Sequence, residues 1–241
     1  KSATFAGLVP HPDARLQGFP TPHGTGFFVS KDGYFITARH VLEKESVNKT
    51  LYNFSEIFLT KPEQLAWDVS NLSIVKDWPK WDLALLKADW EKSKSNAAFR
   101  GKDGFDFLEI DFSVVPEGTQ VYAFGYPLPD IRVVGNQRMM IGFHYFCPRA
   151  TSAMISSHDY IIGTLRGRLS FPEYYVIDKA LNPGNSGGPI VGGETGKAIA
   201  VCQALQKFRL PQESGVEVEV PSLYGIAVSL KNIENDLRQF L

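Results

Sequence analysis

Leu181-Asn182-Pro183-Gly184-Asn185-Ser186-Gly187-Gly188-Pro189 is the stretch that decides how this sequence folds. It places one serine among three glycines, two prolines and two asparagines, between the apolar runs 175–177 and 190–191. Glycine and asparagine tolerate backbone conformations that most residues avoid, and proline fixes turns, so the stretch is incompatible with a helix or a regular strand. We predict a tight loop whose consecutive N–H groups point into one concavity and stabilise an oxyanion there. Ser186, held beside that concavity, is a candidate nucleophile.

Two interpretations of this loop compete. A short glycine pattern around a serine is common, and it often marks an ordinary surface turn. Here the match is longer, because residues 178–190 resemble the nucleophile loop of trypsin-like serine proteases. The resemblance is greatest to the HtrA/Deg branch and its simple bacterial relatives, which carry Asn just before the serine. It implies that a histidine and an aspartate lie upstream.

The histidine candidate is His40. Two β-rich runs within residues 24–38 are joined around Asp32-Gly33, which predicts a hairpin with a tight type I′ turn, and His40 follows in a short polar turn. A histidine at a strand end is more often structural than catalytic. This segment, however, resembles the histidine segment of HtrA-like proteases, which implies that His40 is a general base. Arg39 stands where the family usually has Asn or a small residue, and its cation either disfavours a charge on His40 or points to solvent.

The aspartate candidate opens the run Asp82-Leu83-Ala84-Leu85-Leu86. A buried unpaired charge is costly, so Asp82 must be exposed or paired. The plain alternative is a solvent-facing carboxylate at a strand end. The run resembles the aspartate motif of the family. The chain order His40, Asp82, Ser186 suits a first half that holds the histidine and the aspartate and a second half that holds the serine.

The resemblance implies an all-β fold of two six-stranded antiparallel β-barrels with a C-terminal helix. We expect the N-terminal barrel at about residues 18–115, the C-terminal barrel at about 116–228 and the helix at 229–241. Apolar residues at 230, 233, 237 and 240 have helical spacing, and Ser229 is the expected N-cap. Many HtrA proteins continue into a PDZ domain, and no such extension follows the helix in this sequence.

Other segments carry weaker patterns. We expect residues 1–20 to be an extended arm, 91–107 a surface excursion and 207–221 a polar excursion between two strands. Ser157-His158-Asp159 contains the three residue types of a triad in a row. Neighbours along an extended chain point to opposite faces, so these residues cannot form a relay, and we predict a turn there.

The resemblance also assigns roles. Ser186 would attack a peptide carbonyl, His40 would transfer the proton and Asp82 would orient the imidazole, with no cofactor. The backbone N–H groups of Gly184 and Ser186 would hold the oxyanion. Asn185 carries no charge with which to bind a freed N-terminus, so activity is expected not to depend on cleavage at Lys1.

The resemblance predicts an apolar substrate pocket. The family sets its pocket floor about six residues before the serine, and this position is Ala180, where trypsin-type enzymes have Asp. We therefore expect cleavage of a polypeptide substrate after small or medium aliphatic residues. The predicted pocket residues are Ala180, Leu181, Gly225, Ile226 and Ala227.

Composition excludes several other classes. The formal net charge of −1 gives no general attraction to nucleic acid, and no apolar run is long enough to span a bilayer. Cys147 and Cys202 have no Cys or His neighbour at metal-ligand spacing, so we expect no zinc site. Both lie in apolar runs and are expected to be free, buried thiols.

Two alternatives to an active protease stay open. A protease-like domain kept for binding or scaffolding would have the same fold, but degenerate copies usually lose one triad residue, and all three candidates are present. An esterase-type hydrolase would place its nucleophile between a strand and a helix. Here the β-like Ile190-Val191 follow the serine, which disfavours that alternative.

Overall fold

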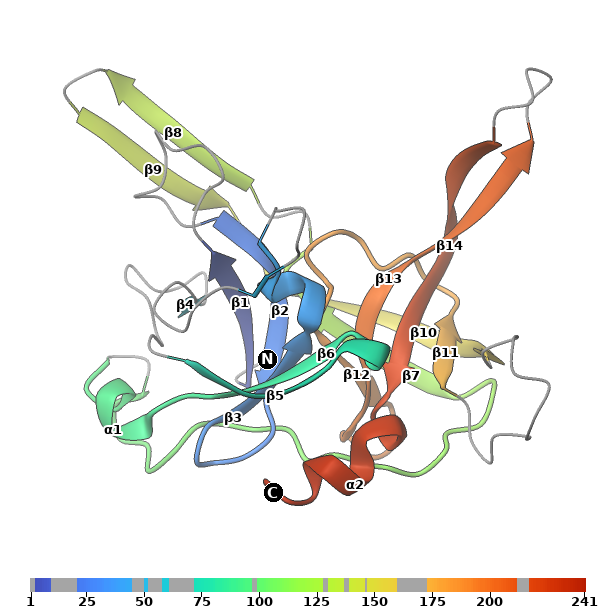
Figure 1. The fold of residues 1–241 in the computed structure, drawn as a ribbon, viewed down its shortest axis with the longest axis horizontal. Helices are drawn as coiled ribbons and strands as arrows, with labels where there is room; N and C mark the ends of the chain where they lie inside the picture. Colours follow the sequence, from blue (N-terminus) through green and yellow to red (C-terminus); the bar gives the residue numbers. More distant parts are fainter. Residues whose placement is uncertain are drawn as a thin grey trace.

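The structure is a computed structural model. It describes residues 3–9, 21–44, 50–51, 58–60, 72–96, 99–127, 130–136, 139–145, 147–159, 173–211 and 217–241. Within these residues the chain is predominantly β, with a six-stranded sheet and a closed six-stranded barrel that share a core, and a separate two-stranded hairpin (Figure 1).

The first sheet has six antiparallel strands in the order β4-β1-β2-β3-β6-β5. They are β1 (Thr4–Val9), β2 (Thr21–Phe28), β3 (Tyr34–Ala38), β4 (Phe58–Thr60), β5 (Ser73–Trp78) and β6 (Leu83–Lys87). Within the described residues no pairing joins the edge strands β4 and β5. The prediction of two closed barrels is therefore confirmed for the second sheet only.

The second sheet is a closed barrel in the order β10-β11-β14-β13-β12-β7. Its strands are β7 (Gln120–Gly125), β10 (Arg149–Asp159), β11 (Tyr174–Ile177), β12 (Pro189–Gly192), β13 (Ala198–Pro211) and β14 (Glu217–Ser229). Every pairing in it is antiparallel, and closure leaves no free edge inside the barrel itself.

The first sheet is buried on both faces. Alternate side chains along its strands enter two different cores. Phe28 and Leu86 pack into a core rich in phenylalanine inside the first sheet. Their neighbours Phe27 and Leu85 face the opposite way, into a core shared with the barrel and the C-terminal segment, where they meet Val201. Successive side chains on a strand point to opposite faces, so one strand serves both cores. This double burial fixes the register of the strands that carry the site.

Two ribbons extend from the sheets. One is the hairpin of β8 (Asp130–Asn136) and β9 (Met139–Tyr145), and the other is the outer part of β13 and β14. Figure 1 shows the two ribbons rising on opposite sides and diverging. The polar excursion predicted at 207–221 is wrong for its described part, because β13 and β14 stay paired as far as Pro211 and Glu217.

The turn between β2 and β3 differs from the predicted type I′ form. Val29 N–H donates to the Tyr34 carbonyl at 2.8 Å, which leaves a four-residue loop. Only Gly33 has a positive φ there, +100°, whereas a type I′ turn needs positive φ at both central residues. The loop is held by the Ser30 hydroxyl, which accepts from Tyr34 N–H at 3.1 Å.

The expectation of a surface excursion at 91–107 was wrong for the end of that segment. Phe99 and Phe105 are 3% and 2% exposed, and Phe105 stacks on Phe28 at 4.2 Å between centroids. The polar residues around them, including the short helix α1 (Trp90–Ser93), hide this anchoring in the sequence. The described part of the predicted extended arm is indeed extended, and it forms β1, which pairs with β2 and β4.

The C-terminal segment is a 3₁₀ turn (Leu230–Ile233) followed by the single helical turn α2 (Glu234–Leu237) rather than a helix over 229–241. The predicted N-cap is confirmed, because the Ser229 hydroxyl accepts from Lys231 N–H at 3.3 Å. The apolar residues 230, 233 and 237 are buried in the core shared by the two sheets. The segment therefore ties the end of β14 to both halves.

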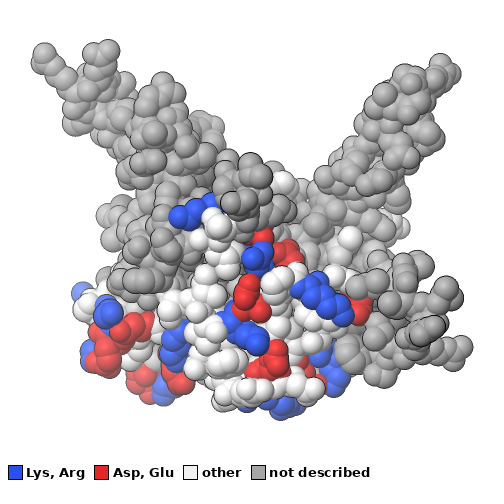
Figure 2. Space-filling model, in the orientation of Figure 1, with Lys and Arg blue, Asp and Glu red and all other residues white. Residues whose placement is uncertain are grey.

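Charges of both signs are mixed over the described part of the surface. In Figure 2, the coloured residues on this face show Lys and Arg side chains beside Asp and Glu. One example is Lys197, which bonds to Glu109 at 2.7 Å and holds the pKa of that carboxyl below its usual value. Among the described helices, none is long and apolar enough to cross a membrane.

The two cysteines are both free, but only one is buried as predicted. Cys202 lies in the barrel core, and burial raises the pKa of its thiol to about 12, whereas Cys147 is exposed. Because the thiolate is the reactive form, Cys202 is expected to be inert in the native protein.

This difference predicts selective alkylation at pH 8. A Cys147→Ser variant should incorporate no iodoacetamide when native and one equivalent after unfolding in urea, as read by mass spectrometry. A Cys202→Ser variant serves as the control and should be labelled while native. Rapid native labelling of Cys202 in the first variant would contradict the burial.

Candidate active site

His40 lies on a 3₁₀ turn (Arg39–Leu42) that directly follows β3. Val41 and Leu42 are buried in the core, 2% exposed each, and their burial anchors the turn. The turn is also fixed at its start, where Arg39 N–H donates to the Asp82 carbonyl at 2.8 Å. The His40 side chain stays 41% exposed, so the imidazole is accessible from the cavity.

Asp82 is brought to His40 by strand pairing. Ala38 pairs with Leu83, so the residues that follow β3 and precede β6 lie side by side although 42 residues separate them. One Asp82 oxygen, Oδ1, accepts from His40 N–H at 2.8 Å, and Oδ2 lies 2.5 Å from His40 Nδ1. The carboxylate therefore fixes both the backbone and the ring of His40, with Nε2 left for the cavity.

The Asp82 backbone has an uncommon conformation. Its φ of 51° and ψ of 42° lie in the left-handed region, and no other non-glycine residue in the described part of the chain has a positive φ. Aspartate is among the few residues that tolerate this region. The residue follows a 3₁₀ turn (Pro79–Trp81) that ends with Asp82 N–H donating to the Pro79 carbonyl at 3.3 Å.

The charge of Arg39 is paired with two carboxylates, so its side chain does not simply point to solvent as one of the predicted alternatives had it. Arg39 Nε donates to Asp77 Oδ2 at 3.0 Å, and Nη1 pairs with Glu43. The guanidinium side chain is 21% exposed and links the 3₁₀ turn of His40 to β5. Arg39 therefore acts as a brace for the turn.

The serine loop connects β11 to β12, as its glycines and prolines predict. Gly184 and Gly187 have φ of 95° and 85°. A side chain at Gly187 would place its Cβ 2.1 Å from the Thr25 carbonyl oxygen, so only glycine fits. Turn hydrogen bonds close the loop, with Asn185 N–H donating to the Asn182 carbonyl at 3.0 Å.

Thr25 fastens this loop to the first sheet. Thr25 N–H donates to the Ser186 carbonyl at 2.8 Å, and its hydroxyl donates to the Gly184 carbonyl at 2.6 Å. The same hydroxyl accepts from Tyr126 N–H at 3.1 Å. Thr25 is 1% exposed, and sequence reasoning did not single it out, although the Gly-Thr-Gly pattern around it was visible.

The N–H groups of Gly184 and Ser186, predicted to face an oxyanion, donate to no acceptor within the described residues. The Gly184 carbonyl accepts from the Thr25 hydroxyl at 2.6 Å. Asn185, between them, is buried beside Gly125, where an added Cβ would lie 2.6 Å from Asn185 Oδ1.

Gln203 contacts both the serine and the aspartate, and it was not among the predicted site residues. Ser186 Oγ donates to the Gln203 carbonyl at 2.9 Å, and Gln203 Nε2 donates to the Asp82 carbonyl at 3.2 Å. Its side chain is a buried polar group, 7% exposed, at the point where the apolar run of β13 ends. The only sign of this role in the sequence was that a polar residue follows the apolar run 198–202.

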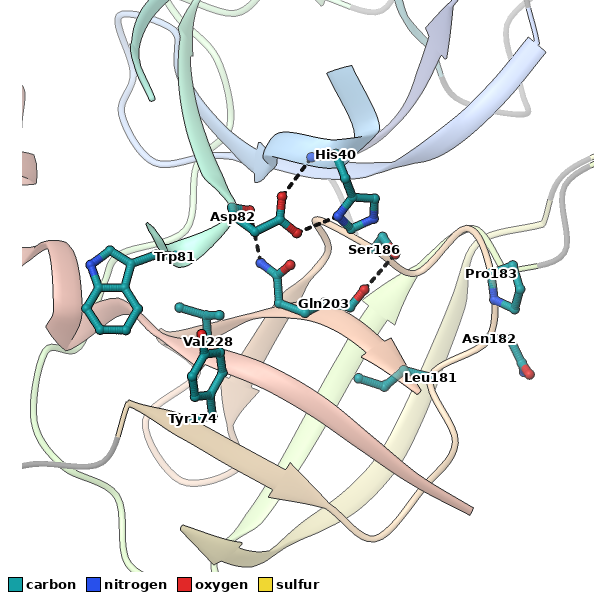
Figure 3. A pocket seen from close by; sticks show the side chains of 10 residues that line it. All are labelled: His40, Trp81, Asp82, Tyr174, Leu181, Asn182, Pro183, Ser186, Gln203 and Val228. Carbon is teal, nitrogen blue, oxygen red and sulfur yellow. Dashed lines mark hydrogen bonds and ion pairs between the residues drawn. The ribbon is translucent and has the colours of Figure 1, made fainter. Parts of the chain in front are cut away.

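His40, Asp82 and Ser186 line one cavity of about 500 Å³ (Figure 3). Trp81 and Tyr174, 6.3 Å apart between ring centroids, form the side of the cavity away from Ser186. The full lining is His40, Trp81, Asp82, Tyr174, Leu181, Asn182, Pro183, Ser186, Gln203 and Val228.

Of the five residues predicted to bind substrate, Leu181 lines the cavity. It packs on Gly225 so closely that a Cβ there would lie 2.3 Å from Leu181 Cγ. Ala227 is fully buried in the barrel core. Ala180 and Ile226 are half-buried and outside the lining of this cavity, whereas Val228, which was not predicted, is part of it.

The other histidines lie away from this cavity or outside the described residues. Ser157-His158-Asp159 forms the end of β10, so the predicted turn is wrong. His158 Nε2 bonds to the Val115 carbonyl at 2.8 Å, which is a structural contact. His11 lies outside the described residues. No group of three His, Cys, Asp or Glu side chains arranged to hold a metal ion is found in the described part of the chain.

The family match and the most similar curated proteins agree with each other. Residues 24–201 match the family described as trypsin-like peptidase domain. A probable periplasmic serine endoprotease DegP-like of Chlamydia trachomatis is 29% identical over 208 residues, 83% of this chain and 32% of that protein. The Bartonella henselae protein of the same description is 29% identical over 187 residues, 77% of this chain and 28% of that protein. The chain thus spans about a third of the length of these relatives.

Solved structures show the same fold. The MamO protease domain from Magnetospirillum magneticum aligns with a TM-score of 0.53 at 19% identity, covering 98% of this chain and 95% of that one. A serine endoprotease from Yersinia pestis aligns with a TM-score of 0.58 at 18% identity, covering 99% of this chain and 62% of that one. At such identities the likeness concerns the fold alone. Because the family match covers most of the sequence, the chain belongs to the trypsin-like peptidase family, with relatives of the DegP/HtrA type.

Proposed function

We propose that this chain is a serine endopeptidase that hydrolyses peptide bonds through His40, Asp82 and Ser186. The observation that carries the proposal is the 2.5 Å contact between His40 Nδ1 and Asp82 Oδ2 in a cavity that Ser186 also lines. A carboxylate on one ring nitrogen fixes the tautomer in which the other nitrogen accepts a proton. This is the arrangement that activates a hydroxyl.

In the proposed reaction, Ser186 Oγ attacks the substrate carbonyl carbon while its proton moves to His40 Nε2. The resulting tetrahedral intermediate collapses, the C–N bond breaks, and His40 returns the proton to the leaving amine. Water then repeats the sequence on the acyl-enzyme, with His40 again as base, and releases the acid. Asp82 stabilises the imidazolium in both steps, and no cofactor takes part.

The oxyanion would be held by the backbone N–H groups of Gly184 and Ser186. Both are without an acceptor in the described residues, and Gly184 has no side chain to obstruct the substrate. One such donor typically contributes about 3 kcal/mol to the transition state. Thr25 supports this arrangement because its hydrogen bonds to the Gly184 and Ser186 carbonyls fix the loop that carries these N–H groups.

A second candidate is a protease-like binding domain without turnover. The observation in its favour is that the Ser186 hydroxyl donates to the Gln203 carbonyl at 2.9 Å. Attack requires rotation of this hydroxyl toward His40 Nε2. An active enzyme makes this rotation when substrate binds, whereas a silent domain does not, and covalent labelling of Ser186 separates the two.

The proposed substrate specificity is for small or medium apolar residues before the cleaved bond. Leu181 fills the space beside Gly225, which limits the depth of the cavity next to Ser186. Among the described residues, its wall carries Leu181 and Val228 and no charged side chain other than those of the His40–Asp82 pair. A long charged side chain would lose its hydration there without a partner.

The sheets also fit the two-barrel division of the family. We propose that the first barrel spans about residues 18–115 and closes through β4 and β5, that the second spans about 116–228, and that 229–241 form the C-terminal element. Ser186 then belongs to the second barrel, and His40 and Asp82 to the first.

Activity-based labelling tests the triad. A fluorophosphonate probe should label the wild-type protein at Ser186, and Ser186→Ala or His40→Ala should abolish labelling because the nucleophile or its base is lost. Asp82→Asn should slow labelling by roughly 10³- to 10⁴-fold, because the imidazole loses its tautomer. Labelling rates are read by gel fluorescence and the site by mass spectrometry.

Ser157→Ala is the matched control, since it removes the serine of the other Ser-His-Asp sequence and should leave labelling unchanged. Each variant is compared with the wild type by thermal unfolding. A folded wild-type protein that takes no label at Ser186 would favour the silent binding domain.

The pocket is tested with a peptide library followed by mass spectrometry. Cleavage is expected after Ala, Val and similar residues. Leu181→Ala should shift the preference toward Leu and Phe by about 10-fold or more, because side chains of extra size gain contacts of about 1–3 kcal/mol. Ile199→Ala, in the barrel core away from the cavity, controls for the stability cost of a core deletion. Cleavage only after Arg or Lys would refute the apolar pocket.

The role of Thr25 is tested by a conservative pair of variants. Thr25→Val keeps the shape but removes the hydroxyl that bonds to the Gly184 carbonyl and Tyr126 N–H, so kcat should fall by about 10-fold or more at similar KM. Thr25→Ser retains the hydroxyl and should restore most of kcat. Equal activity of the two variants would show that the hydroxyl does not support the oxyanion site.

A further inference from the structure

Glu173 is the only Asp, Glu, Lys or Arg that is buried among the residues that the structure describes. Its side chain is 4% exposed, and within that part of the chain its Oε2 has no hydrogen-bond partner. The one ion pair that it forms there is with Lys80, whose Nζ lies 3.5 Å from Oε1. A buried carboxylate with so few partners costs stability, because its lost hydration is not replaced. Polar groups that break this rule are expected at functional sites.

The backbone of Glu173 is fixed to the barrel. Its carbonyl accepts from Ser229 N–H at 3.1 Å and from Asn232 Nδ2 at 2.7 Å. The next residue, Tyr174, is the first of β11. The carboxylate is therefore held at a defined point of the second sheet, and Lys80 reaches it from the first.

Lys80 belongs to the 3₁₀ turn that directly precedes Asp82. Its ammonium nitrogen also lies 3.9 Å from the centre of the Trp81 ring. Trp81 contacts Tyr174 at 6.3 Å between ring centroids, on the far side of the cavity in Figure 3. Two neighbouring residues of the turn thus contact two neighbouring residues of the barrel. This double contact joins the two halves beside the candidate aspartate.

The turn orients one of the two peptide planes that meet at Asp82. Asp82 N–H donates to the Pro79 carbonyl at 3.3 Å, which orients the plane before Asp82. The Asp82 carbonyl accepts from Arg39 N–H and from Gln203 Nε2, which orients the plane after it. The left-handed φ of 51° and ψ of 42° depend on both planes. A shift of the turn would therefore change the direction of the Asp82 carboxylate.

The start of the turn has an anchor of its own. Asp236 Oδ2 accepts from Trp78 Nε1 at 2.7 Å, and the Asp236 side chain is 46% exposed, so that it keeps much of its hydration. Glu173 is the corresponding anchor at the end of the turn, where Asp82 follows. It is the more costly of the two because it is buried.

We propose that Glu173 is a positioning residue of the proposed triad. Through Lys80 it fixes the turn before Asp82, and the turn directs the Asp82 carboxylate toward His40. Neither partner of this ion pair lines the cavity, so the pair acts on the rate of the chemistry and not on substrate binding. This inference rests on the proposed peptidase function and adds a residue that supports its triad.

Paired methionine substitutions separate positioning from stability. Replacement of both partners of a buried ion pair by apolar residues of similar size usually leaves a protein about as stable as before. The double variant Lys80→Met/Glu173→Met should therefore unfold at a temperature close to that of the wild type. Its rate constant for fluorophosphonate labelling at Ser186 should nevertheless fall by about 10-fold or more, because misplacement of a catalytic group by about 1 Å can cost about 100-fold.

A second measurement follows Asp82 without requiring turnover. In the wild type, the proton on His40 Nδ1 lies in a 2.5 Å contact with the Asp82 carboxylate. Such a short, charge-assisted hydrogen bond should give a strongly downfield proton resonance by NMR. In the double methionine variant this resonance should move upfield or broaden by exchange with water.

Three further variants control the experiment. Lys80→Arg retains the cation and should keep most of the labelling rate. Lys102→Met is the matched control, since it removes a lysine from its 2.5 Å ion pair with Asp106 outside the cavity, and it should change neither readout. Lys80→Met alone should be less stable than the double variant, because it leaves the Glu173 carboxylate buried without a cation.

Two results for a folded double methionine variant would overturn the proposal. One is labelling at the wild-type rate. The other is slow labelling with an unchanged His40 resonance, since the effect would then not pass through Asp82. Should the double variant fail to fold, Glu173→Gln decides, because it keeps the shape and removes the charge. It should slow labelling by about 3-fold or more and shift the resonance, and no change in either would overturn the proposal.

Failure of this proposal is distinguishable from failure of the proposed function. If the folded wild type takes no label at Ser186, the peptidase proposal fails, and the His40 resonance still reports whether Glu173 orients Asp82. If the wild type and the double methionine variant are labelled equally fast, only the positioning role fails.

Discussion

The hydrogen bonds of Thr25 are the constraint on which the site depends. They cross from the first sheet to the serine loop, with the Thr25 N–H on the Ser186 carbonyl and the hydroxyl on the Gly184 carbonyl. The loop needs this support because Gly184 and Gly187 give it little stiffness of its own. A second crossing, from Gln203 to the Asp82 carbonyl at 3.2 Å, links the halves on the other side of the cavity. The three catalytic candidates, His40, Asp82 and Ser186, lie between these two links.

The local parts of this site were predictable from the sequence because their physics is local. A loop that requires positive φ must contain glycine, so the position of Ser186 was visible in composition alone. The sequence also shows that His40 follows two β-rich runs and that Asp82 begins an apolar run, so both residues could be predicted to lie at strand ends. Their convergence required the fold, and the resemblance to a known family provided it. The closed second barrel was implied by that resemblance, and the buried apolar face of the C-terminal segment was predicted from its helical spacing.

The features that could not be predicted from the sequence depend on contacts between residues far apart in the chain. Gln203 reaches a carbonyl 121 residues away, and no local pattern marks such a bond. Leu181 blocks the space beside Gly225 only because β14 and the loop meet. Phe99 and Phe105 lie within polar sequence, and their burial is decided by Phe28 and Trp90. The ribbon at the end of β13 was missed, although Phe208 and Leu210 alternate with Lys207 and Arg209 in the pattern typical of a strand.

The backbone of Asp82 explains why both halves must be in place. A left-handed conformation costs an ordinary residue about 1–2 kcal/mol, and it persists only where neighbours determine it. For Asp82 those neighbours are His40 N–H and Arg39 N–H from the first sheet and the Gln203 amide from the barrel. If the Gln203 amide no longer bonds to the Asp82 carbonyl, only the hydrogen bonds from the first sheet hold Asp82 in its left-handed conformation. The orientation of the carboxylate toward His40 then depends on how the two halves pack, and not only on the strand that carries the aspartate.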